Sequence, residues 1–128
     1  MHIEHVAFAL PDPAAAAAWY AEHLGFELVR ASAASPFAHF LLAPGGGVMI
    51  EILHDADAGV PDYRQLLSLQ GHLAFEVEDV DEDYRRLVAA GAAGEGAPAL
   101  SPAGDRYAML RDPWGVPLQL VTRAQRMM

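Results

Sequence analysis

Residues 5–12 read His-Val-Ala-Phe-Ala-Leu-Pro-Asp, and residues 72–79 read His-Leu-Ala-Phe-Glu-Val-Glu-Asp. The His, Ala, Phe and Asp recur at the same places in both stretches, and the bulky apolar residues alternate as they do in half-buried strands. Each Asp stands where its side chain can cap a following helix. A repeated phrase with the same continuation indicates an internal duplication. The sequence therefore predicts two copies of one module.

In the first copy, a strand over 2–10 is followed by a helix that starts at Asp12-Pro13 and ends at Gly25. Asp suits the cap, Pro suits the first helical position, and Gly suits the left-handed residue after a helix. Three more strands are predicted in this copy. They lie at 26–30, 37–42 and 48–53.

In the second copy, a strand over 72–77 leads into a helix that begins after Asp79 and ends at Gly91. A short irregular strand is expected within 94–101. The tetrapeptide at 112–115, Asp-Pro-Trp-Gly, has the composition of a type I turn. The strands before and after that turn are predicted at 106–111 and 117–121.

Both copies thus read βαβββ, which predicts one α+β domain over 1–128. Module 1 covers about 1–54, a linker about 55–70 and module 2 about 71–123. Within the linker, a helical turn is expected at 63–69.

Composition excludes several classes of protein. The net charge is −9, every one of the eight basic residues is Arg, and there is no Cys. Without Cys there are no disulfides or thiolate ligands, and without Lys there is no Schiff base. Scattered Arg in an acidic chain is atypical of proteins that bind nucleic acid or anionic membranes. No signal peptide is visible, so we expect a cytoplasmic protein with neither of those partners.

Four polar residues interrupt the predicted strands, and each is out of phase with the bulky apolar residues around it. These are His5, Glu51, His72 and Gln119. Because alternate side chains point to opposite faces, all four are predicted to point away from the face that the helices cover. A single strand His is more often a hydrogen-bonded core residue than a ligand. Four such residues at equivalent places in two copies favour a metal site.

Two imidazoles, a carboxylate and a carboxamide oxygen form a mixed nitrogen and oxygen donor set. It suits Zn, Ni, Co, Mn or Fe(II) with positions left for water or substrate. Further residues are predicted to line the pocket, and these are His39, Glu76, Tyr107 and Met109.

The paired βαβββ modules, the His-x-Ala-Phe openings, the Asp-Pro-Trp-Gly turn and the final Pro-Leu-Gln-Leu-Val resemble the vicinal oxygen chelate superfamily. It includes glyoxalase I, methylmalonyl-CoA epimerase, extradiol dioxygenases, fosfomycin-resistance proteins and bleomycin-binding proteins. The resemblance implies curved mixed sheets around a concave site. It also implies that His5, Glu51, His72 and Gln119 bind a divalent ion, which chelates neighbouring oxygens of a small substrate.

The resemblance further implies glyoxalase-like chemistry of the isomerase or lyase type, in which a proton is removed next to a carbonyl. Gln119 stands where glyoxalase I has Glu, so Glu51 alone remains as a carboxylate base. The alternatives are an extradiol-type dioxygenase and a protein that binds a small antibiotic or toxin without turnover. In short members of the superfamily the two modules of a site usually come from different subunits. We therefore expect a homodimer with sites at its interface.

Overall fold

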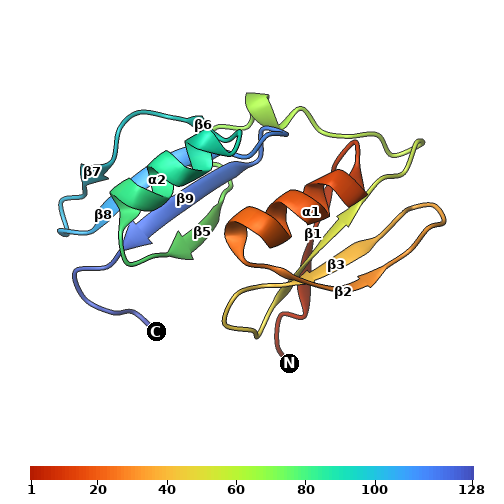
Figure 1. Cartoon of the computed structure of the whole chain (residues 1–128), viewed down its shortest axis with the longest axis horizontal. Coiled ribbons are helices and arrows are strands. Elements are labelled where there is room, and N and C mark those ends of the chain that lie inside the picture. The colour runs from red at the N-terminus through yellow and green to blue at the C-terminus, as the bar shows by residue number, and fades with distance from the viewer. The chain divides into compact units, whose positions relative to one another are not determined.

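The computed structural model describes all 128 residues, which divide into two compact units, Met1–Pro61 and Asp62–Met128. In each unit one helix lies against one sheet (Figure 1). The elements of the first unit are β1 (His5–Ala9), α1 (Pro13–Leu24), β2 (Glu27–Ala31), β3 (His39–Leu42) and β4 (Met49–Leu53).

The second unit repeats this order with one additional short strand. It begins with a 3₁₀ turn, η1 (Tyr63–Gln65). The remaining elements are β5 (Leu73–Glu76), α2 (Val80–Ala89), β6 (Ala93–Gly94), β7 (Ala99–Leu100), β8 (Arg106–Arg111) and β9 (Pro117–Thr122).

Both sheets are mixed. The first has the order β1-β4-β3-β2, in which β1 and β4 are parallel and the other neighbours are antiparallel. The second has the order β5-β9-β8-β6, in which β5 and β9 are parallel and β7 pairs with β8. The predicted α+β fold of two βαβββ-type modules is confirmed. The predicted irregular strand within 94–101 is in fact two separate two-residue strands, β6 and β7.

The helices begin where the sequence places their caps. The Asp12 carboxylate accepts a hydrogen bond from the Ala15 N–H at 3.0 Å, and Asp79 accepts one from the Glu82 N–H at 3.0 Å. Gly25 ends α1 in the left-handed conformation, with φ of 74°. Neither helix is long and apolar enough to cross a membrane.

Each core lies between the helix and one face of its sheet. In the first unit α1 packs against β2, β3 and β4, and in the second α2 packs against β8 and β9. The apolar side chains that are buried there include Ala16, Tyr20, Leu41, Ile50 and Ile52 in the first unit, and Val80, Leu87, Leu110, Leu118 and Leu120 in the second.

The first strand differs from its prediction. It covers His5–Ala9 rather than 2–10, and Val6 is 44% exposed although its phase places it on the helix side. The reason is the position of β1 at the edge of the sheet, since α1 packs mainly on the three other strands. Leu10, directly after the strand, is buried as expected.

The predicted turn between β8 and β9 is present. The Gly115 N–H donates to the Asp112 carbonyl at 2.9 Å, and the buried Asp112 carboxylate accepts from the Trp114 and Val116 N–H groups. Gly115 has φ of 93°, and a Cβ there would lie 2.7 Å from Arg64 Cγ. The turn therefore requires glycine for both its conformation and the space that Arg64 occupies.

Candidate metal centre

The first unit brings two of the predicted ligands together. Ala7 of β1 lies opposite Glu51 of β4 in a parallel pair, so the two side chains share a face. His5 is two residues before Ala7 and therefore has the same orientation. Ile50 and Ile52 are buried on the other face of the sheet. The strand phases thus place His5 and Glu51 on the face away from α1.

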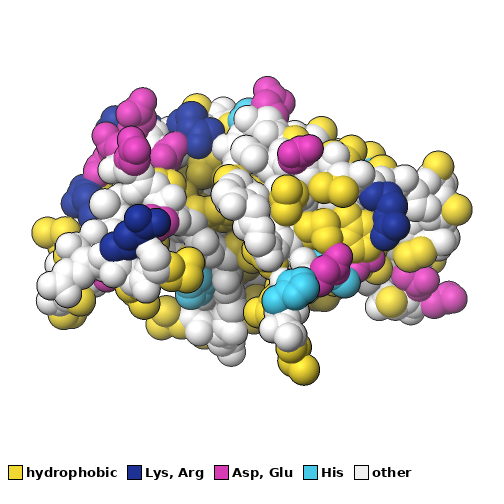
Figure 2. Space-filling model, turned by 90° about the horizontal axis from the view of Figure 1, so that it is seen from below, with side chains coloured by type: hydrophobic (Ala, Val, Ile, Leu, Met, Phe, Trp, Pro, Cys, Tyr) yellow, Lys and Arg dark blue, Asp and Glu magenta, His cyan; other side chains and the backbone are white.

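His5 is held between two carboxylates. Its Nδ1 contacts the Glu4 carboxylate, and its Nε2 lies 3.3 Å from Glu51 Oε2. The hydrogen bond to Glu4 is the main cause that raises the pKa of His5 above its usual value, and the charge of Glu51 adds to it. In Figure 2, histidine side chains lie next to acidic ones and beside an apolar patch on the face that is drawn.

This pair fits a divalent ion. Two donors that each bind one ion at about 2.1 Å lie roughly 3 Å apart in tetrahedral or octahedral geometry. The 3.3 Å between His5 Nε2 and Glu51 Oε2 matches that spacing. A carboxylate on the other ring nitrogen is the partner that metal-binding imidazoles commonly have, because it fixes the ring and its tautomer.

The second unit places the other two predicted ligands in the equivalent way. Ala74 of β5 lies opposite Gln119 of β9 in a parallel pair, and His72 is two residues before Ala74. Leu118 and Leu120 are buried on the other face. Gln119 is half-buried and lies opposite Met109 of β8.

The tautomer of His72 follows from its hydrogen bond. Its Nδ1 lies 2.7 Å from the carbonyl oxygen of Ser68, which can only accept, so Nδ1 carries the proton. In the neutral form of this ring the lone pair lies on Nε2, the state in which imidazole binds a metal ion. The same ring nitrogen, Nδ1, is thus held by an oxygen in both His5 and His72.

Ser68 is in turn fixed by Glu95, which pairs with the half-buried Arg111. The Arg111 guanidinium donates to the carbonyls of Tyr63, Leu66 and Gly115, and it pairs with the Glu95 carboxylate. The Ser68 hydroxyl donates to the other Glu95 oxygen at 2.5 Å. These contacts hold the segment before β5 against the sheet. They therefore position the Ser68 carbonyl that orients His72.

We expect Arg111→Lys to lower the free energy of unfolding of the second unit by about 1–3 kcal/mol, because an ammonium cannot satisfy the same carbonyls at once. Urea unfolding followed by circular dichroism measures this. Arg126→Lys in the exposed C-terminal tail is the matched control and should change stability by less than about 0.5 kcal/mol. Equal, small changes in both variants would contradict the role of Arg111.

The stability of this region is expected to depend on pH because of Glu95. Its hydrogen bond from Ser68, and then its pair with Arg111, hold the pKa of Glu95 below its usual value. A carboxyl whose pKa is lowered by folding contributes stability above its unfolded value, near 4.5, and loses that contribution as pH falls through the folded value. Glu95→Gln should therefore be less stable than the original protein at pH 7, and the difference should shrink as pH is lowered towards 3. A difference that does not change with pH would contradict this.

The residues predicted to line the site lie in three places. Tyr107 and Met109 line a pocket of about 360 Å³ together with Gln119. Glu76 lies opposite Val121 on this face of the second sheet and is exposed. His39 differs, because it lies opposite Ile52 and so on the helix side of the first sheet, where it lines another pocket.

Each unit by itself carries two of the four predicted ligands. No group of three or more His, Asp or Glu side chains that could hold an ion is present in the structure. Sequence patterns did not indicate Glu4, Ser68 or Arg111. Glu4 could have been noticed as the acidic neighbour of His5, but the contacts of Arg111 bridge distant segments and have no local signal.

Two mixed sheets, each with a helix on one face and polar strand residues on the other, define a glyoxalase-like protein. A family model described as Glyoxalase/Bleomycin resistance protein/Dioxygenase superfamily matches residues 2–120. The chain belongs to that superfamily. None of the curated proteins matches the sequence.

Solved structures of similar fold include enzymes and binding proteins. A family enzyme from Burkholderia phytofirmans PsJN is 23% identical, with a TM-score of 0.74 over 95% of this chain and 98% of that one. TnmS3, an antibiotic binding protein from Streptomyces sp. CB03234, is 24% identical, with a TM-score of 0.74 over 97% of both chains. A glyoxalase/bleomycin resistance protein from the same Streptomyces is 25% identical, with a TM-score of 0.66 over 92% of this chain and 97% of that one.

Proposed function

We propose that the protein is a divalent-metal enzyme of the glyoxalase type, which transfers a proton next to a carbonyl of a small oxygenated substrate. His5, Glu51, His72 and Gln119 would hold the ion, which is Zn, Ni, Co, Mn or Fe(II). The observation that carries this proposal is the 3.3 Å spacing of His5 Nε2 and Glu51 Oε2, with Glu4 on the opposite ring nitrogen. The Nε2 lone pair of His72 supports it from the second unit.

When bound, a divalent ion would polarise the substrate carbonyl and favour negative charge on its oxygen. Glu51 is the only carboxylate among the four residues, so it is the proposed base that removes the proton from the neighbouring carbon. His5 would bind the ion beside Glu51, because its Nε2 lies 3.3 Å from Glu51 Oε2. Tyr107 and Met109, which line the pocket beside Gln119, would contact the substrate body.

Substitution of Gln119 tests directly whether this residue binds the proposed ion. We expect Gln119→Glu to raise the affinity for Ni²⁺ or Zn²⁺ by about tenfold or more, because a charged carboxylate replaces a neutral amide oxygen. Isomerase activity on hemithioacetals should rise with it, since a second carboxylate becomes available as a base. Calorimetric titration and a hemithioacetal assay measure the two effects. Gln125→Glu, a change of the same kind at an exposed residue of the C-terminal tail, is the control. If neither quantity changes, Gln119 does not bind the ion.

A second candidate function is binding of a small antibiotic or toxin without turnover. The pocket beside Gln119 has a wall of Leu69, Tyr107, Met109 and Val121, which suits an apolar ligand. The similar fold of TnmS3, an antibiotic binding protein, adds support. Metal content after purification separates the two functions. A protein that remains metal-free after incubation with Ni²⁺, Co²⁺, Zn²⁺ or Mn²⁺ and still binds an apolar ligand would favour sequestration.

We further propose a homodimer in which each site takes one module from each subunit. Each unit carries one His and one oxygen donor, and these make half of a four-ligand site. A two-fold pairing would make two equivalent sites from one interface.

A further inference from the structure

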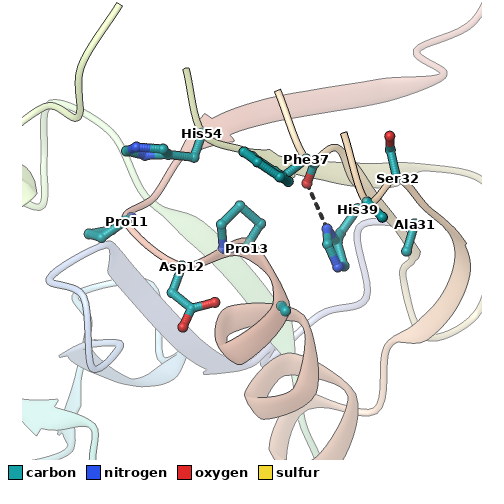
Figure 3. A pocket seen from close by; sticks show the side chains of 10 residues that line it. Pro11, Asp12, Pro13, Ala31, Ser32, Phe37, His39 and His54 are labelled. Carbon is teal, nitrogen blue, oxygen red and sulfur yellow. Dashed lines mark hydrogen bonds between the residues drawn. The ribbon is translucent and has the colours of Figure 1, made fainter. Parts of the chain in front are cut away.

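One pocket of the first unit lies away from the proposed metal centre. It has a volume of about 550 Å³, in the range of small-molecule sites. Asp12 at the start of α1, His39 at the start of β3 and His54 after β4 surround it, and Figure 3 shows Pro13 and Phe37 between the two imidazoles. His39 lies opposite Ile52, and Glu51 has the reverse phase, so this pocket and the Glu51 face are on opposite sides of the sheet.

The side chains of this pocket offer mainly hydrogen-bond acceptors, because the Ser32 hydroxyl already donates to the Ala34 carbonyl at 3.2 Å. Nδ1 of His39 lies 2.7 Å from the Phe37 carbonyl, and Nδ1 of His54 lies 3.2 Å from the Leu10 carbonyl. Because a carbonyl only accepts, both Nδ1 atoms carry a proton, and in the neutral form of each ring Nε2 is left as an acceptor. Asp12 uses one carboxylate oxygen for the Ala15 N–H, and no Arg lines the pocket. A ligand that carries hydrogen-bond donors and a positive charge complements these groups.

Phe37, the aromatic residue of the pocket, has an unusual backbone conformation. Phe37 has φ of 55°, a left-handed value that is rare for a bulky residue and strains the backbone. Its N–H donates to the Ala34 carbonyl at 2.7 Å, and its side chain remains 40% exposed. Strained residues of this kind cluster at ligand sites. The strain here holds an aromatic ring at the pocket, where it could pack against an aromatic ligand.

From these observations we propose that this pocket binds a small aromatic amine as its ammonium form. The ammonium group pairs with Asp12 and donates to an imidazole Nε2, and the aromatic body packs against Phe37. This second binding site is independent of the proposed metal centre, because it uses none of the same residues.

Three naphthalene probes test the charge that the pocket selects. The probes are 2-naphthylmethylamine, the neutral 2-naphthylmethanol and the anionic 2-naphthoate, and their binding at pH 7.5 is followed by fluorescence. We expect the amine to bind most tightly and the naphthoate least. Asp12→Asn should weaken the amine about fivefold, or about 1 kcal/mol, and leave the alcohol unchanged. Asn still caps a helix, so α1 is retained.

Asp79→Asn is the matched control, because Asp79 caps α2 in the same way and does not line this pocket. It should bind all three probes as the original protein does. Ala31→Phe, which fills the pocket from β2, should abolish binding of amine and alcohol, with circular dichroism confirming the fold. The proposal is overturned if the amine does not bind, if Asp12→Asn and Asp79→Asn have equal effects, or if Ala31→Phe binds the probes unchanged.

Discussion

After incubation with Ni²⁺, Co²⁺, Zn²⁺ or Mn²⁺ and removal of excess ion, the protein should retain about one ion per chain, and His72→Ala should retain almost none. The carbonyl of Ser68 fixes His72 so that Nε2 offers its lone pair, and alanine removes that donor entirely. Loss of a partner behind a metal ligand already lowers affinity by about 10–100-fold, so loss of a ligand should exceed that range. Elemental analysis of the dialysed proteins measures the retained ion.

His2→Ala is the matched control for this experiment. His2 is exposed and precedes β1, so its loss should leave the metal content unchanged. Glu51→Gln should lower the content as His72→Ala does, because a neutral amide replaces the only carboxylate of the proposed site. Equal metal content in the original protein and in His72→Ala would refute the assignment of His72.

Much of the fold could be predicted from short sequence patterns because the contacts behind those patterns join residues that are close in sequence. A capping Asp bonds to an N–H three residues later, and the turn at 112–115 closes on itself, so both can be recognised within a few residues. Alternation also predicted correctly that Ile50 and Ile52, or Leu118 and Leu120, would be buried on the helix side.

The features that patterns did not predict depend on partners that are distant in sequence. Val6 is exposed because its strand is at the sheet edge, which alternation alone does not reveal. The face that His39 occupies depends on the register between β3 and β4. Arg111 satisfies carbonyls more than forty residues away, at Tyr63 and Leu66. The ligand candidates could be predicted because strand phase is local, whereas their supporting groups could not.

The opposite faces of the first sheet make the two proposed sites separable by experiment. Asp12→Asn acts on the helix side, where Ile52 and His39 lie, and Glu51→Gln acts on the other side. The first variant should alter amine binding without altering metal content, and the second should do the reverse. Failure of one proposal would therefore leave the other intact.

The last prediction concerns the subunits that share a site. His5→Ala and His72→Ala proteins, each unable to retain metal, should regain about a quarter of the original metal content when they are mixed and allowed to exchange subunits. Random exchange makes about half of the dimers mixed. In each mixed dimer, one site combines both altered modules and the other combines both unaltered ones, so half of the sites are complete.

The control mixes two samples of His5→Ala protein, which should regain nothing under the same exchange conditions. A mixture of His5→Ala with Glu51→Gln should also regain nothing, because both changes lie in module 1 and no pairing restores that module. This second control separates sharing of sites from general stabilisation on mixing. Light scattering reports whether the protein is dimeric at all. A monomer, or a mixture of His5→Ala and His72→Ala that stays metal-free after proven exchange, would mean that no site is shared between subunits.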